Sequence, residues 1–306
     1  MMVTASIRES TGHSSAGGLP GTAQATMAAE PIVVGADSSY LGRAALWWAA
    51  GHAWLVGSDL EVYLQDSKNR VDRYPPVIAP STRAFPLLPM HVHACPDPVE
   101  RLVAASRRAQ LLVVGFRERP AGGGIQRRVA IRAACDVLVV RGRPLAMRGG
   151  NRQVTALLGT GDDETAVRGA VQLAESRGVP LRLCRALPRA TVPPQRAGRP
   201  VTRTTGHPAE RSLEREVAAL DAAAELADRL APQLRVVADL VRSSTSELIE
   251  STEDTDVLVI AAGTALTLTQ LDLTQLDLTH PVRTAADRAL CPVLVTRRPV
   301  LGAGRR

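Results

Sequence analysis

A run of three glycines flanked by arginines is the part of the sequence best suited to bind a charged ligand. The glycines are Gly122, Gly123 and Gly124, and the arginines around them are Arg117, Arg119, Arg127 and Arg128. Successive backbone N–H groups in a glycine-rich turn can bind an anion, because glycine accepts positive φ and lets the main chain come close. The segment therefore has two interpretations, a phosphate-binding loop or a flexible surface loop.

Groups suited to metal binding or catalysis are sparse. His91, His93 and Cys95 alternate along an expected strand, so their side chains would share one face. Structural zinc sites use four ligands, and no fourth is evident, so we predict no metal site. The nearest approach to an acid–base pair is His280 close to Asp277, and proximity within a loop does not predict catalysis. We therefore expect that the protein is not an enzyme.

These residues lie in two degenerate copies of one unit. The first copy opens over residues 31–64 and the second over 153–187. Each reads as an apolar strand, a polar loop, an amphipathic helix and a second strand, with Gly57 and Gly178 as expected helix C-caps. The copies also end alike, since VAIRAACDVLVVR (129–141) matches AADRALCPVLVTR (285–297).

Apolar strands that alternate with helices predict a parallel sheet covered on both faces. We expect strands near 31–36, 60–65, 90–95, 111–115 and 137–141, and near 154–159, 181–186, 234–239, 257–261 and 293–297. The predicted fold class is α/β, with two tandem, doubly wound domains of five parallel strands each. The expected boundaries are a disordered leader at 1–30, domains at 31–146 and 153–300, a linker at 147–152 and a tail at 301–306. Ligands of such domains bind at the carboxyl ends of the strands.

Three segments depart from a simple duplication. A long helix is expected over 209–231, whereas the matching stretch of the first copy, 68–89, contains five prolines and is predicted to be irregular. A direct repeat, TQLDL-TQLDL, occupies 269–278 and reads as a partner-binding or a drifted insert. On the first helix, Trp47 and Trp54 share a face, which favours core or interface packing.

The motifs and their order resemble the universal stress protein family in its tandem, two-domain form. The resemblance rests on VVGADSS (33–39), RAALWWAA (43–50), DPVERL (97–102), LLVVG (111–115) and the cysteine turns at Cys135 and Cys291. It covers nearly all of residues 31–298. It implies a five-stranded parallel sheet in each domain and pairing of the two final strands as an intramolecular pseudo-dimer, with a homodimer left open. It also implies a possible ligand, because a subset of that family binds ATP.

Nucleotide-binding members resemble one another in an Asp after the first strand and a G-x2-G-x9-G-[S/T] loop after the fourth. On the first copy this places Asp37, next to Ser38, near a ribose or adenine group and Gly115 at the first glycine. Gly122–Gly124 would lie near the last glycine, and Mg²⁺ would accompany ATP. Asp37 could instead cap the following helix, in competition with Ser38 and Ser39. The second glycine position holds Glu118, which opposes a phosphate.

The second copy has lost more of this pattern. Its loop carries Ala261 and Thr264 at the first two glycine positions, and Thr279-His280 at the final pair. The aspartate position aligns with Gly161, which is followed by three acidic residues. The resemblance therefore implies weak or absent adenine-nucleotide binding in the first domain and none in the second.

The charge of the chain supports the same asymmetry. The net charge is +7, and residues 101–148 hold eleven arginines against Glu118 and Asp136. No nucleic-acid-binding motif appears, and the last 190 residues contain no aromatic side chain, so we expect no nucleic-acid partner. Four cysteines without CxxC spacing, no secretory signal and no long apolar run indicate a cytoplasmic protein without a membrane segment.

The sequence therefore predicts a cytoplasmic stress-response regulator of the universal stress type. Its partner would be an adenine nucleotide or an unidentified protein. Two alternatives stay open: an ATP-binding or weakly hydrolysing member of the same family, and a protein scaffold that acts through residues 269–278 or 68–89.

Overall fold

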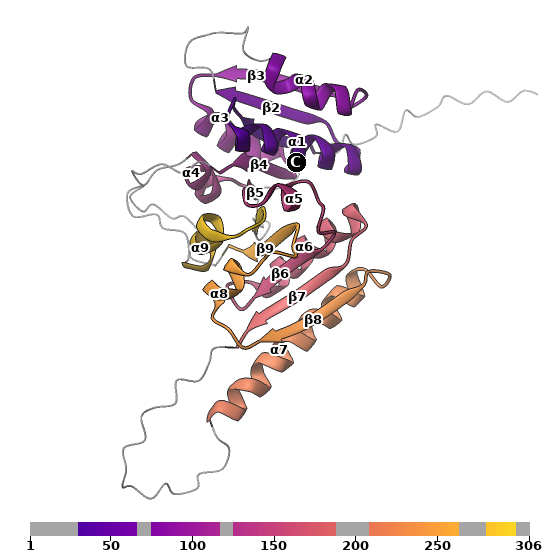
Figure 1. Ribbon diagram of the computed structural model, residues 1–306, viewed down its shortest axis with the longest axis vertical. Coiled ribbons are helices and arrows are strands. Elements are labelled where there is room, and N and C mark those ends of the chain that lie inside the picture. The colour runs from indigo at the N-terminus through magenta and orange to yellow at the C-terminus, as the bar shows by residue number, and fades with distance from the viewer. Residues whose placement is uncertain (1–29, 66–74, 117–124, 188–207, 263–279, 298–306) are drawn as a thin grey trace, which may run out of the picture.

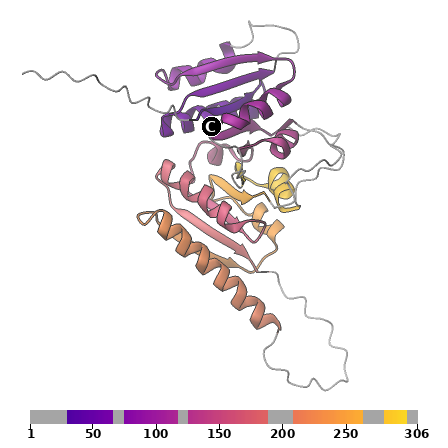
Figure 2. The same cartoon turned by 180° about the vertical axis from the view of Figure 1, so that it is seen from behind.

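The computed structural model describes residues 30–65, 75–116, 125–187, 208–262 and 280–297. Their ten strands form one sheet in the order β3-β2-β1-β4-β5-β10-β9-β6-β7-β8. The strands of the first half are β1 (Ile32–Ala36), β2 (Leu60–Gln65), β3 (Met90–Cys95), β4 (Leu111–Gly115) and β5 (Asp136–Val140). Those of the second are β6 (Val154–Leu158), β7 (Leu181–Ala186), β8 (Val236–Val241), β9 (Val257–Ala261) and β10 (Val293–Thr296). The two halves follow one another along the long axis of the molecule (Figures 1 and 2).

Helices cover both faces of the sheet. The face that carries α1 (Tyr40–Val56) and α2 (Pro75–Ala84) also carries α6 (Asp163–Arg177) and α7 (Pro208–Leu230). The opposite face carries α3 (Pro98–Ala105), α4 (Ile125–Arg132), α8 (Thr245–Glu250) and α9 (His280–Arg288). Two short elements complete the fold. A 3-10 turn, Ser106–Arg108, follows α3, and the short helix α5 (Pro144–Met147) follows β5. The predicted α/β fold class is confirmed, and all ten expected strands lie within about two residues of their predicted ranges.

Within each half the strands are parallel, with β1 between β2 and β4 and β6 between β7 and β9. The chain reverses its winding between β1 and β4, so the carboxyl ends of these two strands form a switch point where α/β sheets bind ligands. Parallel strands need apolar residues on both faces, because helices cover both. The strand VTALL, Val154–Leu158, is accordingly buried throughout.

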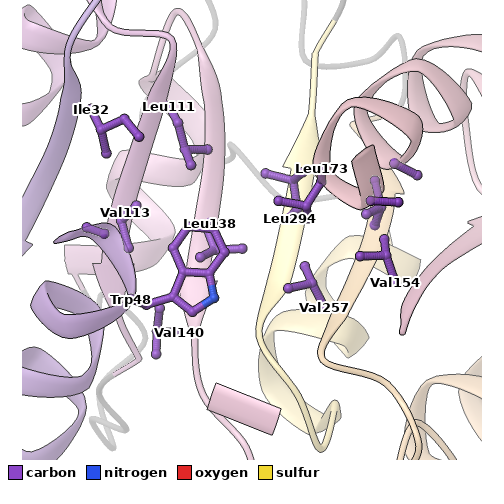
Figure 3. Close-up of a cluster of buried hydrophobic side chains, with 14 of the residues drawn as sticks. Ile32, Trp48, Leu111, Val113, Leu138, Val140, Val154, Leu173, Val257 and Leu294 are labelled. Carbon is purple, nitrogen blue, oxygen red and sulfur yellow. The ribbon is translucent and has the colours of Figure 1, made fainter. Parts of the chain in front are cut away.

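The two halves join through their final strands, as expected. β5 and β10 are antiparallel, with Leu138 opposite Leu294. On the face with α1 and α6, one continuous cluster of buried side chains runs across this junction, from Val113 and Leu138 to Leu294 and Val257 (Figure 3). The pairing leaves β3 and β8 as the edges of a single sheet.

The two predicted glycine C-caps are confirmed, whereas the prediction of an irregular segment is wrong for residues 75–84. Gly57 and Gly178 end their helices in the left-handed conformation, at φ of 66° and 61°. Residues 75–84, predicted to be irregular, form α2, because Pro75 occupies the first turn, where no N–H bond is required. Trp47 and Trp54, for which core or interface packing was expected, are 41% and 47% exposed and so lie outside the core.

Both exposed tryptophans lie close to Phe85. The ring centroid of Phe85 is 5.5 Å from that of Trp47 and 6.3 Å from that of Trp54. Trp48 is instead the buried tryptophan of α1, at 3% exposure. Among the described residues, no helix is long and apolar enough to cross a membrane.

Candidate functional site

A cleft lies at the switch point of the first half, with about 480 Å³ of empty space that opens to solvent. The ends of β1 and β4 form its floor, and the start of α1, α3 and α4 surround it. Its lining comprises Gly35, Ala36, Asp37, Ser39, Gly42, Tyr63, Pro98, Leu102, Val114, Gly115, Phe116 and Gln126. Two of the predicted site residues, Asp37 and Gly115, are therefore brought together at the expected edge of the sheet.

Two glycines allow the start of α1 to lie close to the ends of β1 and β4. A Cβ atom on Gly115 would lie 2.6 Å from the carbonyl oxygen of Leu41, and one on Gly42 would lie 2.2 Å from Asp37 Oδ1. Neither side-chain atom fits without moving the backbone, since real Cβ contacts are not this short. Gly115 therefore has a packing role whether or not a ligand binds here.

Asp37 and the two serines after it have separate tasks. Ser39 is the N-cap of α1, and its hydroxyl accepts from Gly42 N at 3.0 Å. Asp37 Oδ1 accepts from Ser39 N at 2.8 Å, which fixes the carboxylate at the edge of the cleft. Ser38 is exposed and lies outside the cleft lining, and its carbonyl accepts from the Arg43 guanidinium. The helix cap is thus Ser39, and Asp37 contributes a carboxylate to the cleft.

The predicted phosphate loop lies outside the described residues, which stop at Phe116 and resume at Ile125. Gly122, Gly123, Gly124 and Glu118 belong to that stretch. At its borders, Phe116 and Gln126 line the cleft. The Arg141 guanidinium lies 4.5 Å from the centroid of the Phe116 ring, so a cation stands beside this part of the site.

The second half differs at the matching position. Ile32 of β1 pairs with the first residues of β2 and β4, as Val154 of β6 does with those of β7 and β9. By this register, the residue of the second half that is equivalent to Asp37 is Gly159, not Gly161. The sequence alignment placed this position two residues too late, and the loop before α6, which is one residue longer than the loop before α1, explains one of them.

Arg185 of β7 lies against Gly159. A Cβ on that glycine would be 3.3 Å from Arg185 Cζ. Arg185 Nη1 is 2.6 Å from Asp163 Oδ2, and Arg185 Nε also pairs with Glu216 of α7. Asp163 Oδ1 in turn accepts from Gly159 N at 2.6 Å. Where the first half has a carboxylate beside a cleft, the second has a backbone glycine and a guanidinium bound by two carboxylates.

The other candidate residues form no metal centre. The described part of the chain contains no group of three or more His, Cys, Asp or Glu residues placed to hold a metal ion. His93 stacks on Tyr63 with ring centroids 4.7 Å apart, and Cys95 is buried. Burial also raises the pKa of both Cys135 and Cys291 to about 12, so these thiols are neutral at physiological pH.

Sequence reasoning missed several residues of the cleft lining. Tyr63, Leu102 and Phe116 come from β2, α3 and the end of β4. Tyr63 pairs with Gly35 in the sheet, so its position could have been inferred from strand alternation once the register was known. Leu102 could not be found in this way, because its contact with the cleft depends on how α3 lies against the sheet.

Comparison with known proteins places the fold. No protein-family profile matches the chain, and no curated protein sequence matches it. The crystal structure of a universal stress protein from Archaeoglobus fulgidus covers 89% of this chain and 97% of its own, with a TM-score of 0.59 and 13% identity. That of a putative universal stress protein from Pseudomonas aeruginosa covers 88% and 94%, with a TM-score of 0.54 and 14% identity. The chain therefore shares the fold of these proteins over most of its length.

Proposed function

We propose that this protein is a stress-response regulator of the universal stress type. In this proposal its first half binds an adenine nucleotide with low affinity at the switch-point cleft, its second half binds none, and the protein acts in the cytoplasm. The similarity of the whole fold to universal stress proteins supports the family assignment. The nucleotide assignment is argued from the site itself.

The observation that carries the proposal is the difference between the two switch points. In the first half, Asp37 stands at the edge of a cleft whose floor is left open by Gly35 and Gly115. In the second half, Arg185 lies against Gly159 and is held by Asp163 and Glu216. A nucleotide would have to displace these ion pairs, and separating partly buried charges is costly.

Within the first half, the described residues fit the base and sugar end of a nucleotide. The Asp37 carboxylate would accept a hydrogen bond from a ribose hydroxyl or an adenine amino group, and Phe116 would contact the base. The phosphates, with Mg²⁺, would extend toward Gly122–Gly124. A bound nucleotide would supply a ligand-dependent signal, and we propose no chemical step on it.

Binding without turnover is the better proposal for this cleft. Among its described lining residues, Asp37 is the sole carboxylate, and no histidine, cysteine or lysine accompanies it. General-base activation of water needs a base matched in pKa and position to the attacked phosphate. Phosphate release above background that is lost in Gly123→Val would instead favour the hydrolase alternative.

Calorimetric titration with ATP and Mg²⁺ tests the proposal. We expect one site per chain with a dissociation constant of about 0.1–1 mM, weakened about fivefold in Asp37→Ala by loss of a hydrogen bond. Asp37→Asn keeps an acceptor for Ser39 N and is the control for the structure of the loop. Asp221→Ala, at an exposed position of α7, is the control for the loss of one negative charge. Two sites per chain would contradict the asymmetry, and unchanged affinity in Asp37→Ala would contradict the site.

A further inference from the structure

A second cleft lies between the two halves, on the sheet face that carries α1 and α6. It holds about 450 Å³ of empty space and opens to solvent. Trp48 and His52 of α1 form one wall, Gln172 and Leu173 of α6 form the other, and Leu294 of β10 lies beneath. None of its described lining residues belongs to the switch-point cleft.

Two ring nitrogens at this cleft are buried and have no hydrogen-bond partner among the described residues. They are Trp48 Nε1 and His52 Nδ1, on side chains whose residues are only 3% and 8% exposed. The two rings are adjacent, with centroids 5.1 Å apart. Figure 3 shows Trp48 beside Leu138 and Val140, at the junction with the second half. Buried polar atoms are nearly always satisfied in native proteins, so ordered water or a bound ligand is expected to pair with these two nitrogens.

The surroundings define what that partner can be. The Arg177 guanidinium lies 4.9 Å from the Trp48 ring centroid, which closes one side of the indole. Burial, and secondarily the charge of Arg177, lower the pKa of His52 to about 4, so its ring is neutral and offers one donor and one acceptor. Asp136 also lines the cleft, and its Oδ1 accepts from the backbone N of Arg297 at 2.8 Å.

We propose that this cleft is a second ligand site, which binds a small neutral aromatic molecule bearing a carboxamide. The aromatic ring would lie among Trp48, Leu173 and Leu294. The carbonyl oxygen would accept from the Trp48 indole N–H, and the amide N–H would donate to His52 or to the Asp136 carboxyl. A carboxylate anion has no hydrogen to donate to His52 or Asp136, and a hydrocarbon would leave the ring nitrogens unpaired. This inference is independent of nucleotide binding in the first half.

The indole N–H signals of the protein provide a direct test. The chain has three tryptophans, so a ¹⁵N-correlation spectrum has three indole resonances, assigned with Trp47→Phe and Trp54→Phe. Benzamide is the probe, with benzoate and toluene as the anionic and apolar comparators. We expect benzamide to shift the Trp48 resonance saturably, with a dissociation constant on the order of 1 mM for so small a ligand. Benzoate and toluene should bind at least about tenfold more weakly, which corresponds to the loss of one or two hydrogen bonds.

Matched variants on α6 then locate the site. Gln172 is exposed and lines the cleft, whereas Glu175 is exposed on the same helix and does not. Gln172→Phe should abolish the benzamide shift, while Glu175→Phe and Asp37→Ala should retain it, with folding checked by circular dichroism. The proposal is overturned if benzamide causes no saturable shift of Trp48, if toluene binds as well as benzamide, or if Gln172→Phe leaves binding unchanged.

Discussion

His52 is a titratable group whose protonated form the fold disfavours. Its pKa in the folded protein is about 4, against 6.5 in the unfolded chain, chiefly because it is buried. The unfolded state therefore binds a proton at a higher pH than the folded state. His52 therefore has no effect on the free energy of unfolding above pH 6.5. Below that value it lowers the free energy of unfolding, and the effect levels off below pH 4.

We predict that His52 costs the protein about 2 kcal/mol of unfolding free energy between pH 7.5 and pH 5. His52→Phe keeps a ring beside Trp48 and removes the proton, so its unfolding free energy should rise by this amount relative to wild type on acidification. Denaturant unfolding of both proteins at the two pH values measures the difference. An equal response to pH in both proteins would contradict the burial of a neutral imidazole.

Asp136 should respond to pH in the opposite direction. Burial raises its folded-state pKa from 3.8 to about 6, so folding takes up a proton as the pH falls through 6. The contribution of Asp136 to stability therefore grows on acidification until about pH 3.8. Relative to Asp136→Asn, which keeps an acceptor for Arg297 N, wild type should gain about 1.4 kcal/mol between pH 7.5 and pH 5. A wild type that instead loses stability relative to Asp136→Asn would indicate a carboxylate stabilised by Arg297.

Individual residues of the sites could be predicted only where the chain itself brings them to the edge of the sheet. Asp37 follows β1 and Gly115 ends β4, so both were expected near the switch point, and the structure puts them in one cleft. Trp48 and His52 could not be recognised in this way. They follow Trp47 on a helix that is apolar on several faces, and the side that is buried depends on the contact with α6.

At the scale of elements, the end of β4 and the start of α1 lie in close backbone contact. We predict that Gly115→Ala lowers the unfolding free energy by about 1–3 kcal/mol, because its Cβ would overlap the backbone of Leu41. Gly51→Ala, in the middle of α1, is the matched control. Its Cβ would meet Phe85 at an ordinary 3.6 Å, so it should raise stability by about 0.5–1 kcal/mol. Thermal or denaturant unfolding distinguishes these opposite signs.

The regular elements were largely predictable, and the exceptions have physical reasons. The central strands could be located because parallel strands covered on both faces are short apolar runs, whereas the edge strands β3 and β8 are largely exposed or half-buried. The helix α2 was missed because five prolines in residues 68–89 argued against it. Two of those prolines begin the helix, where they are tolerated, and Pro80 lies inside it. Composition alone cannot distinguish prolines at a helix start from prolines that break a helix.

At the scale of the whole molecule, two arginines link the halves reciprocally. Each follows the last strand of one half and reaches a helix of the other. Arg141 donates to the carbonyl oxygen of Ala286 in α9, and Arg297 donates to that of Ala130 in α4. Because Arg141 and Arg297 match in the two copies, as do the two alanines, the contact has the form expected of a twofold interface. The repeats made pairing of the final strands predictable, but these cross-contacts required the structure.

We predict that these arginines couple the unfolding of the two halves. All three tryptophans lie on α1, so their fluorescence reports the first half, whereas far-ultraviolet circular dichroism reports both. In wild type the two unfolding curves should coincide, because the shared core and the β5–β10 pairing make one cooperative unit.

Each charged hydrogen bond contributes about 1.5–3 kcal/mol, so Arg141→Met combined with Arg297→Met should weaken the junction and separate the two midpoints. Arg43→Met removes a guanidinium–carbonyl bond within the first half and should leave the wild-type coincidence intact. Coincident curves in the double variant would mean that strand pairing and apolar contacts alone hold the halves together.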